Sequence, residues 1–320
     1  MWFILSLACM LFWGAADLFY KKGTDESDRY SHLKTGIWVG LVMGAFAFVL
    51  MPFSETKFSV SSLITNAVRY SPASLCYIIS MVIGYAGLRY LEVSIVSPVQ
   101  NASGAFSAVA MFVYFSLKGQ MGGFFEEFSA LDIAGTVFIV LGVIFLGVVE
   151  QRLSSAEREL KKEERKYRFG ALALLFPVLY CVFDTIGTSA DGIILDEKTG
   201  LGLGEIDVLI LYGLTFFAAG IIAWVYLNIK NKTAVYNPFA KGERTKGVAA
   251  LCEEGGQIFY VYAMASKPVL AAPMVASYCI VSAILARIFI KEKLKAAQYA
   301  CVAVVVIGIV ALGVSEGIAG

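Results

Sequence analysis

The chain has 320 residues, of which 58% are hydrophobic and 16% are charged. Soluble globular domains carry about 25% charged residues, so a water-soluble enzyme or binding module is disfavoured. The net charge of +1 argues against a nucleic-acid partner, because no basic face emerges anywhere in the sequence.

Apolar runs of about 20 residues alternate with short charged segments, which is the pattern of membrane-spanning helices. The sequence predicts ten of them, and the first starts at Trp2 without a preceding basic stretch, as in a retained helix rather than a cleaved signal peptide. The expected helices cover residues 2–20, 35–52, 70–90, 93–117, 130–149, 169–189, 207–229, 247–266, 268–290 and 296–314.

One long polar segment, residues 151–168, divides the chain almost in half. Its dense mixed charge is typical of a solvated helix or linker at the membrane surface. The expected organisation is therefore a five-helix unit over 1–150, a charged cytoplasmic linker over 151–168, and a second five-helix unit over 169–320.

The basic residues indicate an orientation. Most of the 26 lysines and arginines fall in the first, third, fifth, seventh and ninth connections between the expected helices. Cytoplasmic loops carry the excess of lysine and arginine. The distribution predicts a multi-pass protein of an inner or plasma membrane with both termini on the non-cytoplasmic side.

The two halves resemble each other in order along the chain. The segment that ends at Asp17 aligns with the segment that ends at Asp184, Pro98 aligns with Pro273, and the glycine-spaced last helices also match. Because five is odd, two five-helix repeats lie in opposite orientations, as in many secondary transporters whose substrates bind between the halves.

The sequence resembles the EamA-like ten-helix branch of the drug/metabolite transporter superfamily. Trp13-Gly14 with Lys21 is similar to that family's first helix, and the strongest likeness runs from Tyr262 through Glu292 and Gln298 to the last helix. The first half departs from the family pattern before its fifth helix. The resemblance implies ten helices, a central cavity, and export or exchange of small metabolites, without specifying the substrate.

Glu253 and Glu254 are the strongest candidates for function, because they lie near the middle of an expected helix. An ionised side chain at the bilayer centre costs about 2.5–3.5 kcal/mol, so such a residue needs a partner, a wet cavity or a proton. Gln257 lies one turn from Glu253 and extends its polar stripe. These residues are candidates for binding substrate and coupling protons; the structural alternative is a protonated glutamate that only bonds a neighbouring helix.

Further candidates come from the matched segments. Asp184 has no basic neighbour in the sequence and is a candidate for lining the cavity. Asp17 lies four residues from Lys21, so it either lines the cavity or forms an interfacial ion pair with that lysine. In two of the expected helices, a proline causes a break beside polar residues. Polar residues at such a break are tolerated where they line a cavity or contact another helix. Alternatively, the breaks serve packing alone. The remaining candidates are Asn101 and Tyr278, beside these breaks, and Trp13 and Tyr180, which the repeat aligns.

The leading hypothesis is a secondary transporter, exporter or exchanger, of a small organic solute, with protons as the candidate coupling ion and the lipid bilayer as its environment. Alternatives are a lipid-carrier flippase of the same superfamily and a transporter-like scaffold or sensor. An intramembrane enzyme is disfavoured because no catalytic motif occurs in the apolar segments. The single histidine, His32, is expected in a loop, so no metal or other cofactor is predicted. The sequence leaves the oligomeric state open.

Overall fold

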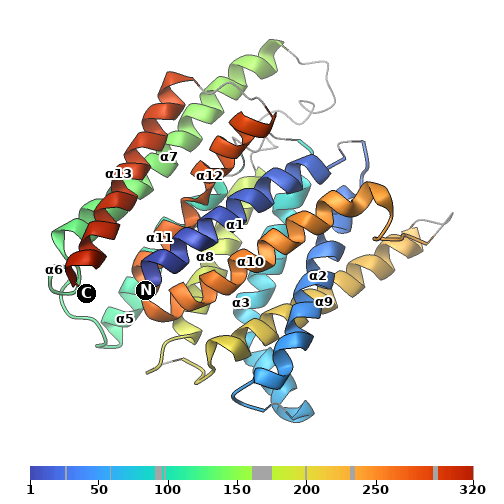
Figure 1. The fold of residues 1–320 in the computed structure, drawn as a ribbon, viewed down its shortest axis with the longest axis horizontal. Coiled ribbons are helices and arrows are strands. Elements are labelled where there is room, and N and C mark those ends of the chain that lie inside the picture. Colours follow the sequence, from blue (N-terminus) through green and yellow to red (C-terminus); the bar gives the residue numbers. More distant parts are fainter. Residues whose placement is uncertain are drawn as a thin grey trace.

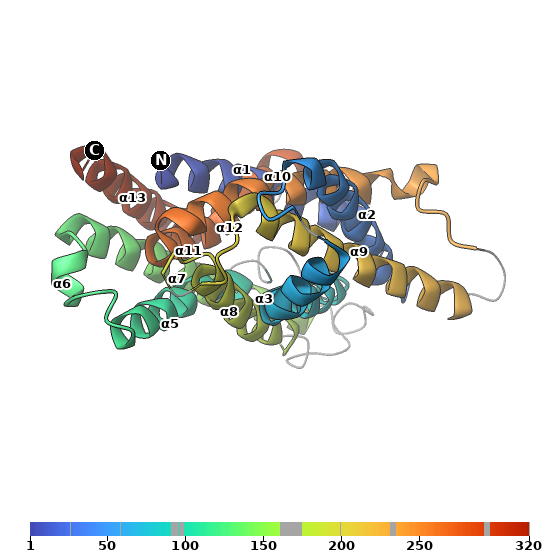
Figure 2. The same cartoon turned by 90° about the horizontal axis from the view of Figure 1, so that it is seen from below.

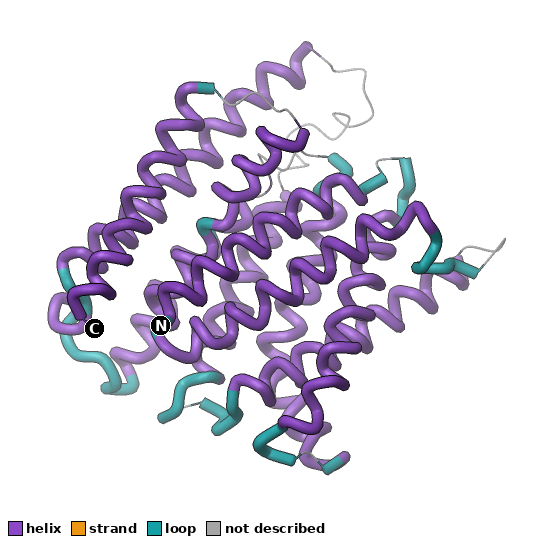
Figure 3. Tube along the Cα trace, viewed as in Figure 1, coloured by secondary structure: helices purple, strands orange, loops and turns teal. Residues whose placement is uncertain are grey.

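The computed structural model describes residues 1–25, 27–57, 59–90, 96, 99–160, 175–198, 200–230, 235–290 and 295–319. Every regular element within these residues is a helix (Figure 3). The main helices are α1 (Trp2–Gly23), α2 (Ser31–Leu50), α3 (Val60–Gly87), α5 (Ser103–Leu117), α6 (Phe124–Glu127), α7 (Ala130–Leu160), α8 (Leu175–Ile194), α9 (Glu205–Lys230), α10 (Arg244–Ser266), α11 (Pro268–Ala276), α12 (Tyr278–Leu285) and α13 (Ala296–Ala319).

Seven candidate spans among the described residues are long and apolar enough to cross a membrane. They are α1, α2, α3, the first part of α7, α9, the α11–α12 segment and α13. Large apolar side chains on α13 point outward, with Ile307 at 56% and Val310 at 58% exposure, as expected of a surface that faces lipid. The expectation of an all-α membrane protein is confirmed at this level.

The helices pack in pairs that join distant parts of the sequence (Figures 1 and 2). α1 lies along α10, α3 along α8, α2 along α9, and α7 along α13. Small residues allow two of these pairs to approach closely. A Cβ atom on Gly40 of α2 would lie 2.5 Å from the Phe216 carbonyl oxygen of α9, and one on Gly135 of α7 would lie 2.9 Å from the Gly308 carbonyl oxygen of α13.

Both ends of the chain lie at the same end of the bundle (Figure 1). The indole Nε1 of Trp2 donates a hydrogen bond of 2.6 Å to Glu316 Oε2 and so connects the start of α1 to the end of α13.

Several boundaries differ from the expected ones. α3 begins ten residues before the expected position, because Ser59 and Ser62 form a capping box: Ser59 Oγ accepts from the Ser62 N–H at 3.2 Å, and Ser62 Oγ accepts from the Ser59 N–H at 2.8 Å. The expectation that His32 lies in a loop is wrong, since this residue is in the first turn of α2. α7 continues through Leu160, so the first part of the charged segment is helical.

The helix expected over 268–290 is broken. α11 contains Pro273 and ends at Ala276, α12 starts at Tyr278, and a π-helical turn follows over Ala286–Ile290. At the break, Ser277 Oγ donates to the Met274 carbonyl oxygen at 2.6 Å, which satisfies one of the acceptors that the interrupted helix leaves. The corresponding Pro98, together with Glu292, lies outside the described residues.

Candidate functional site

A partly open cavity lies among helices α1, α3, α5, α8, α9, α10, α11 and α12. Its volume is about 70 Å³. Since about 10–15 Å³ accommodates one water molecule, the cavity has room for a few waters or for part of a small solute. Its polar and aromatic lining residues are Trp13, Asp17, Tyr20, Tyr77, Tyr85, Gln100, Asn101, Ser103, Tyr180, Asp184, Thr188, Tyr212, Glu253, Gln257, Tyr260 and Tyr278.

Two carboxylates in the cavity have matching surroundings. Asp17 of α1 accepts a hydrogen bond of 2.8 Å from Ser282 Oγ of α12. Asp184 of α8 accepts one of 2.6 Å from Ser103 Oγ of α5. Each carboxylate therefore receives a serine hydroxyl from the broken or shortened helix that packs against its own.

Two aromatic rings lie on glycines of the paired helices. The Trp13 indole of α1 donates through Nε1 to the Glu253 carbonyl oxygen of α10 at 3.1 Å. The same ring covers Gly256, where a Cβ atom would lie 2.2 Å from Trp13 Cδ1. On the other side, the Tyr180 ring of α8 covers Gly84 of α3, where a Cβ atom would lie 2.8 Å from Tyr180 Cδ2. The glycines make space for rings that line the cavity.

Tyr77 connects α3 to three other helices. The hydroxyls of Tyr77 and Tyr260 are 2.5 Å apart, and Tyr77 also donates to Thr188 Oγ1 at 3.2 Å. The ring of Tyr77 packs edge-on against that of Tyr212, with centroids 5.7 Å apart. The result is an aromatic wall that is joined to α8 and α10 by hydroxyl hydrogen bonds and to α9 by ring packing.

Three buried polar side chains in the lining lack such bonds. The amide Nε2 of Gln257 has no hydrogen-bond partner among the described residues, although the side chain is only 2% exposed. The Tyr20 ring stacks near that of Tyr85, with centroids 4.8 Å apart, and lies close to Glu253. Neither tyrosine hydroxyl makes a hydrogen bond of normal geometry. Buried groups of this kind normally bond to water or to a ligand.

Every sequence-predicted site residue except Glu254 lines this cavity: Trp13, Asp17, Asn101, Tyr180, Asp184, Glu253, Gln257 and Tyr278. Glu254 is buried in α10, with 6% exposure, but lies outside the cavity lining. The two glutamates therefore occupy different environments, as successive helical positions about 100° apart require. The role of these residues in binding stays a prediction.

The sequence reasoning missed a further buried carboxylate. Asp191 of α8 is fully buried, and its Oδ1 accepts from the Tyr70 hydroxyl at 2.8 Å. It follows Asp184 by seven residues, or two helical turns, and that spacing on one face could have revealed it. The sequence reasoning also missed five of the cavity's tyrosines, because a tyrosine in an apolar helix is not distinguishable from ordinary core: Tyr20, Tyr77, Tyr85, Tyr212 and Tyr260.

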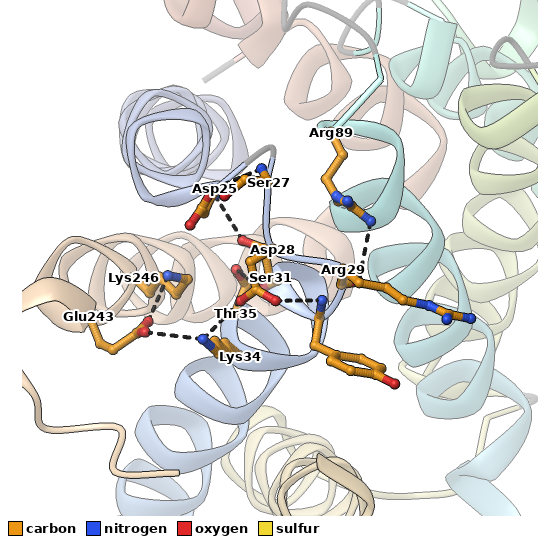
Figure 4. Close-up of polar contacts among 11 residues, drawn as sticks. Asp25, Ser27, Asp28, Arg29, Ser31, Lys34, Thr35, Arg89, Glu243 and Lys246 are labelled. Carbon is orange, nitrogen blue, oxygen red and sulfur yellow. Dashed lines mark hydrogen bonds and ion pairs between the residues drawn. The ribbon is translucent and has the colours of Figure 1, made fainter. Parts of the chain in front are cut away.

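A polar network connects the helix ends on one side of the bundle (Figure 4). Glu243 binds Lys246 at 2.6 Å and lies 3.8 Å from Lys34, which binds Asp28 at 2.8 Å. Burial of Asp28 opposes its ionisation, but bonds from Lys34 and the Tyr30 N–H hold the pKa of Asp28 below its ordinary value. The network fixes the α1–α2 connection to the start of α10.

Two basic side chains near this network donate hydrogen bonds to main-chain carbonyl oxygens. Lys21 Nζ donates to the carbonyl oxygen of Leu88, a lining residue, at 3.3 Å, and Arg89 Nη1 donates to the Arg29 carbonyl oxygen at the same distance. These bonds join α1 and its following loop to the end of α3.

No group of three or more His, Cys, Asp or Glu within the described residues could hold a metal ion.

Comparisons with known proteins show the fold alone. No protein-family model matches the sequence, and no curated protein sequence matches it. One solved structure, described only as "Crystal structure of protein", is similar over 97% of this chain and 96% of its own, with a TM-score of 0.59 and 13% sequence identity.

Proposed function

We propose that this chain is a secondary active transporter of a small organic solute, with ten spanning helices in two inverted five-helix repeats, and that it belongs to the EamA-like branch of the drug/metabolite transporters. The observation that carries the proposal is the central cavity, which is lined by helices of both halves and contains carboxylates from both. Secondary transporters with inverted repeats bind substrate at such an interface.

The helix pairing supports the inverted repeat. If α1, α2, α3, α5 and α7 correspond in order to α8, α9, α10, α11–α12 and α13, the pair α1–α10 is equivalent to the pair α3–α8. The pairs α2–α9, α5–α11 and α7–α13 then each join corresponding helices, as an axis between the halves requires. On this assignment α5, α8 and α10 complete the ten spans.

The site also follows the repeat. Asp17 and Asp184 are aligned in the sequence, and both accept a serine hydroxyl from the opposite half. The aligned Trp13 and Tyr180 both cover a glycine of the opposite half. These matched contacts favour a repeat over chance similarity of apolar helices.

Proton coupling through Glu253 is part of the proposal. Glu253 is buried beside the cavity, where a charge that lacks a partner is unfavourable and a proton or a cationic group stabilises it. Glu253→Gln keeps the shape of the side chain and removes its titratable proton. Glu254→Gln makes the same change at the neighbouring position outside the lining and is the matched control.

The test is counterflow in vesicles that contain the purified protein, after a thermal-shift screen with amino acids, organic cations, nucleosides and sugars. A ligand at 100 times its Kd stabilises the folded state by about 2.7 kcal/mol. We expect the protein to exchange at least one ligand found in the screen. The exchange rate should depend on a pH gradient in the parent chain and in Glu254→Gln, but not in Glu253→Gln. Binding of a ligand without exchange would favour a sensor, and exchange of lipid-linked sugars alone would favour a flippase. If the pH dependence is unchanged in both variants, proton coupling through Glu253 is refuted.

A further inference from the structure

The charge of the cavity lining has one sign. Asp17, Asp184 and Glu253 contribute three carboxyl groups, and none of the lining residues that the structure describes is lysine, arginine or histidine. An anion placed among them would meet repulsion, and the nearby Lys21 Nζ lies outside the lining, where it donates to the Leu88 carbonyl oxygen. A cation would instead replace part of the hydration that the carboxylates lose on burial.

The walls around these carboxylates are aromatic. One tryptophan and seven tyrosines line the cavity. The Trp13 ring lies 5.2 Å from the Tyr260 ring and packs edge-on against the Tyr278 ring at 5.7 Å, so three of these residues form one continuous surface. Aromatic faces attract organic ammonium groups, and they do so most strongly in desolvated sites.

A buried donor in the lining indicates that an occupant also carries an oxygen atom. Gln257 Nε2 has no hydrogen-bond partner among the described residues, although the side chain is only 2% exposed. The hydroxyls of Tyr20 and Tyr85 interact with each other, and that of Tyr20 also interacts with Glu253. A hydroxyl or carbonyl oxygen on a ligand would satisfy the amide donor of Gln257, which the carboxylates and rings do not.

We propose that the cavity binds a small organic cation, an amine or quaternary ammonium compound that also carries an oxygen acceptor. This inference rests on the proposed transport function and names the substrate class of the same site. The carboxylates of Asp17, Asp184 and Glu253 supply the opposite charge, the aromatic wall contacts the ammonium group, and the amide of Gln257 donates to the oxygen.

The test uses three ligands of almost the same shape. Choline is the cation, 3,3-dimethyl-1-butanol replaces its ammonium nitrogen with carbon, and glycine betaine keeps the ammonium group but adds a carboxylate. Ethanolamine extends the series to a primary amine. Binding to the purified full chain is measured by thermal shift and calorimetry, and transport is measured separately by counterflow in vesicles.

We expect choline or ethanolamine to bind at least about tenfold more tightly than both the neutral and the zwitterionic analogues, because the neutral analogue lacks the charge that carboxylates and aromatic faces attract, and the zwitterionic analogue carries a carboxylate that they repel. Asp184→Asn should weaken cation binding by a similar factor. Glu197→Gln, in an exposed loop, should leave it unchanged. Tyr278→Leu should weaken it, and Tyr278→Phe, which keeps the ring, should not.

The two proposals fail in different ways. Equal or tighter binding of the neutral or zwitterionic analogue, or no binding of either cation to folded protein, would overturn the cation assignment. Exchange of sugars, nucleosides or amino acids in the vesicle assay would then still support transport. Cation binding that is lost in Asp184→Asn but accompanied by no exchange of any solute would keep the binding site and overturn the transport function.

Discussion

A single methyl group at Gly256 should displace the ring that forms one wall of the cavity. A Cβ atom there would lie 2.2 Å from Trp13 Cδ1, 2.4 Å from Nε1 and 2.9 Å from Cγ. Because Cγ is the atom through which the ring is attached, rotation of the ring about its own axis cannot remove all three contacts. The indole or helix α10 must move, and the bond from Trp13 Nε1 to the Glu253 carbonyl oxygen would be lost.

The expected change in stability follows from three contributions. Overpacking a tight contact costs about 1–3 kcal/mol, and the lost hydrogen bond costs about 0.5–1.5 kcal/mol. The better helix propensity of alanine returns about 1 kcal/mol. Gly256→Ala should therefore destabilise the fold by about 0.5–3.5 kcal/mol, which corresponds to a decrease in Tm of roughly 1–14 °C at about 2–4 °C per kcal/mol.

The assay is thermal unfolding of purified protein at one fixed scan rate, since membrane proteins often unfold irreversibly. Gly36→Ala is the matched control: Gly36 is in the interior of α2, and a Cβ atom there would meet nothing within 4 Å. That variant should be neutral or stabilised. The double variant Gly256→Ala/Trp13→Phe has a smaller ring and should recover part of the loss. Equal Tm values for the two single variants, or no coupling in the double variant, would refute this account.

Two further predictions concern the surface. A cysteine introduced at the exposed Arg152 of α7 should be shielded from an impermeant thiol reagent in intact cells, and one introduced at the exposed Glu197 should be labelled. The parent chain, which contains the native cysteines alone, is the control. The reverse labelling pattern would invert the proposed orientation. Asp28→Asn should lower Tm slightly at pH 7, since a partly exposed pair with Lys34 contributes less than about 1 kcal/mol. Because folding lowers the pKa of Asp28, its contribution is complete above the unfolded pKa of about 3.9 and is lost as the pH falls through the lower folded value. An equal deficit of the variant at pH 3 and pH 7 would contradict this assignment.

Hydropathy predicted the position of most helices because lipid exposure imposes long apolar runs. The boundaries depend on local chemistry that a hydropathy window does not contain. The capping box of Ser59 and Ser62 extends α3 backwards by ten residues, and the hydroxyl of Ser277 accompanies the break after α11. The proline at 273 indicated that a break would occur but not that the chain would resume as a separate helix.

Conspicuous charges in the sequence led to residues that the structure brings together. Asp17, Asp184 and Glu253 were selected because carboxylates are costly in apolar helices, and all three line one cavity. Glu254 satisfied the same criterion and lies outside the lining, because the sequence does not show which side of α10 faces inward. Tyr77 and Tyr260 could not be selected, since their importance comes from a contact between residues that are 183 positions apart.

Two helices that lack the spanning pattern contribute two of the cavity's three carboxyl groups. α8 and α10 are not among the seven that satisfy length and hydropathy criteria, yet they contribute Asp184 and Glu253 to the cavity lining. Both also expose apolar side chains, such as Val182 at 49% and Leu251 at 62%, so their polar residues lie on the side that meets protein or the cavity instead of lipid. Enclosure of a whole helix is a separate property, because the α11–α12 segment is the most enclosed of the seven candidate spans and is still apolar. A lowered hydropathy in a helix that keeps an apolar outer side therefore indicates polar residues that face inward.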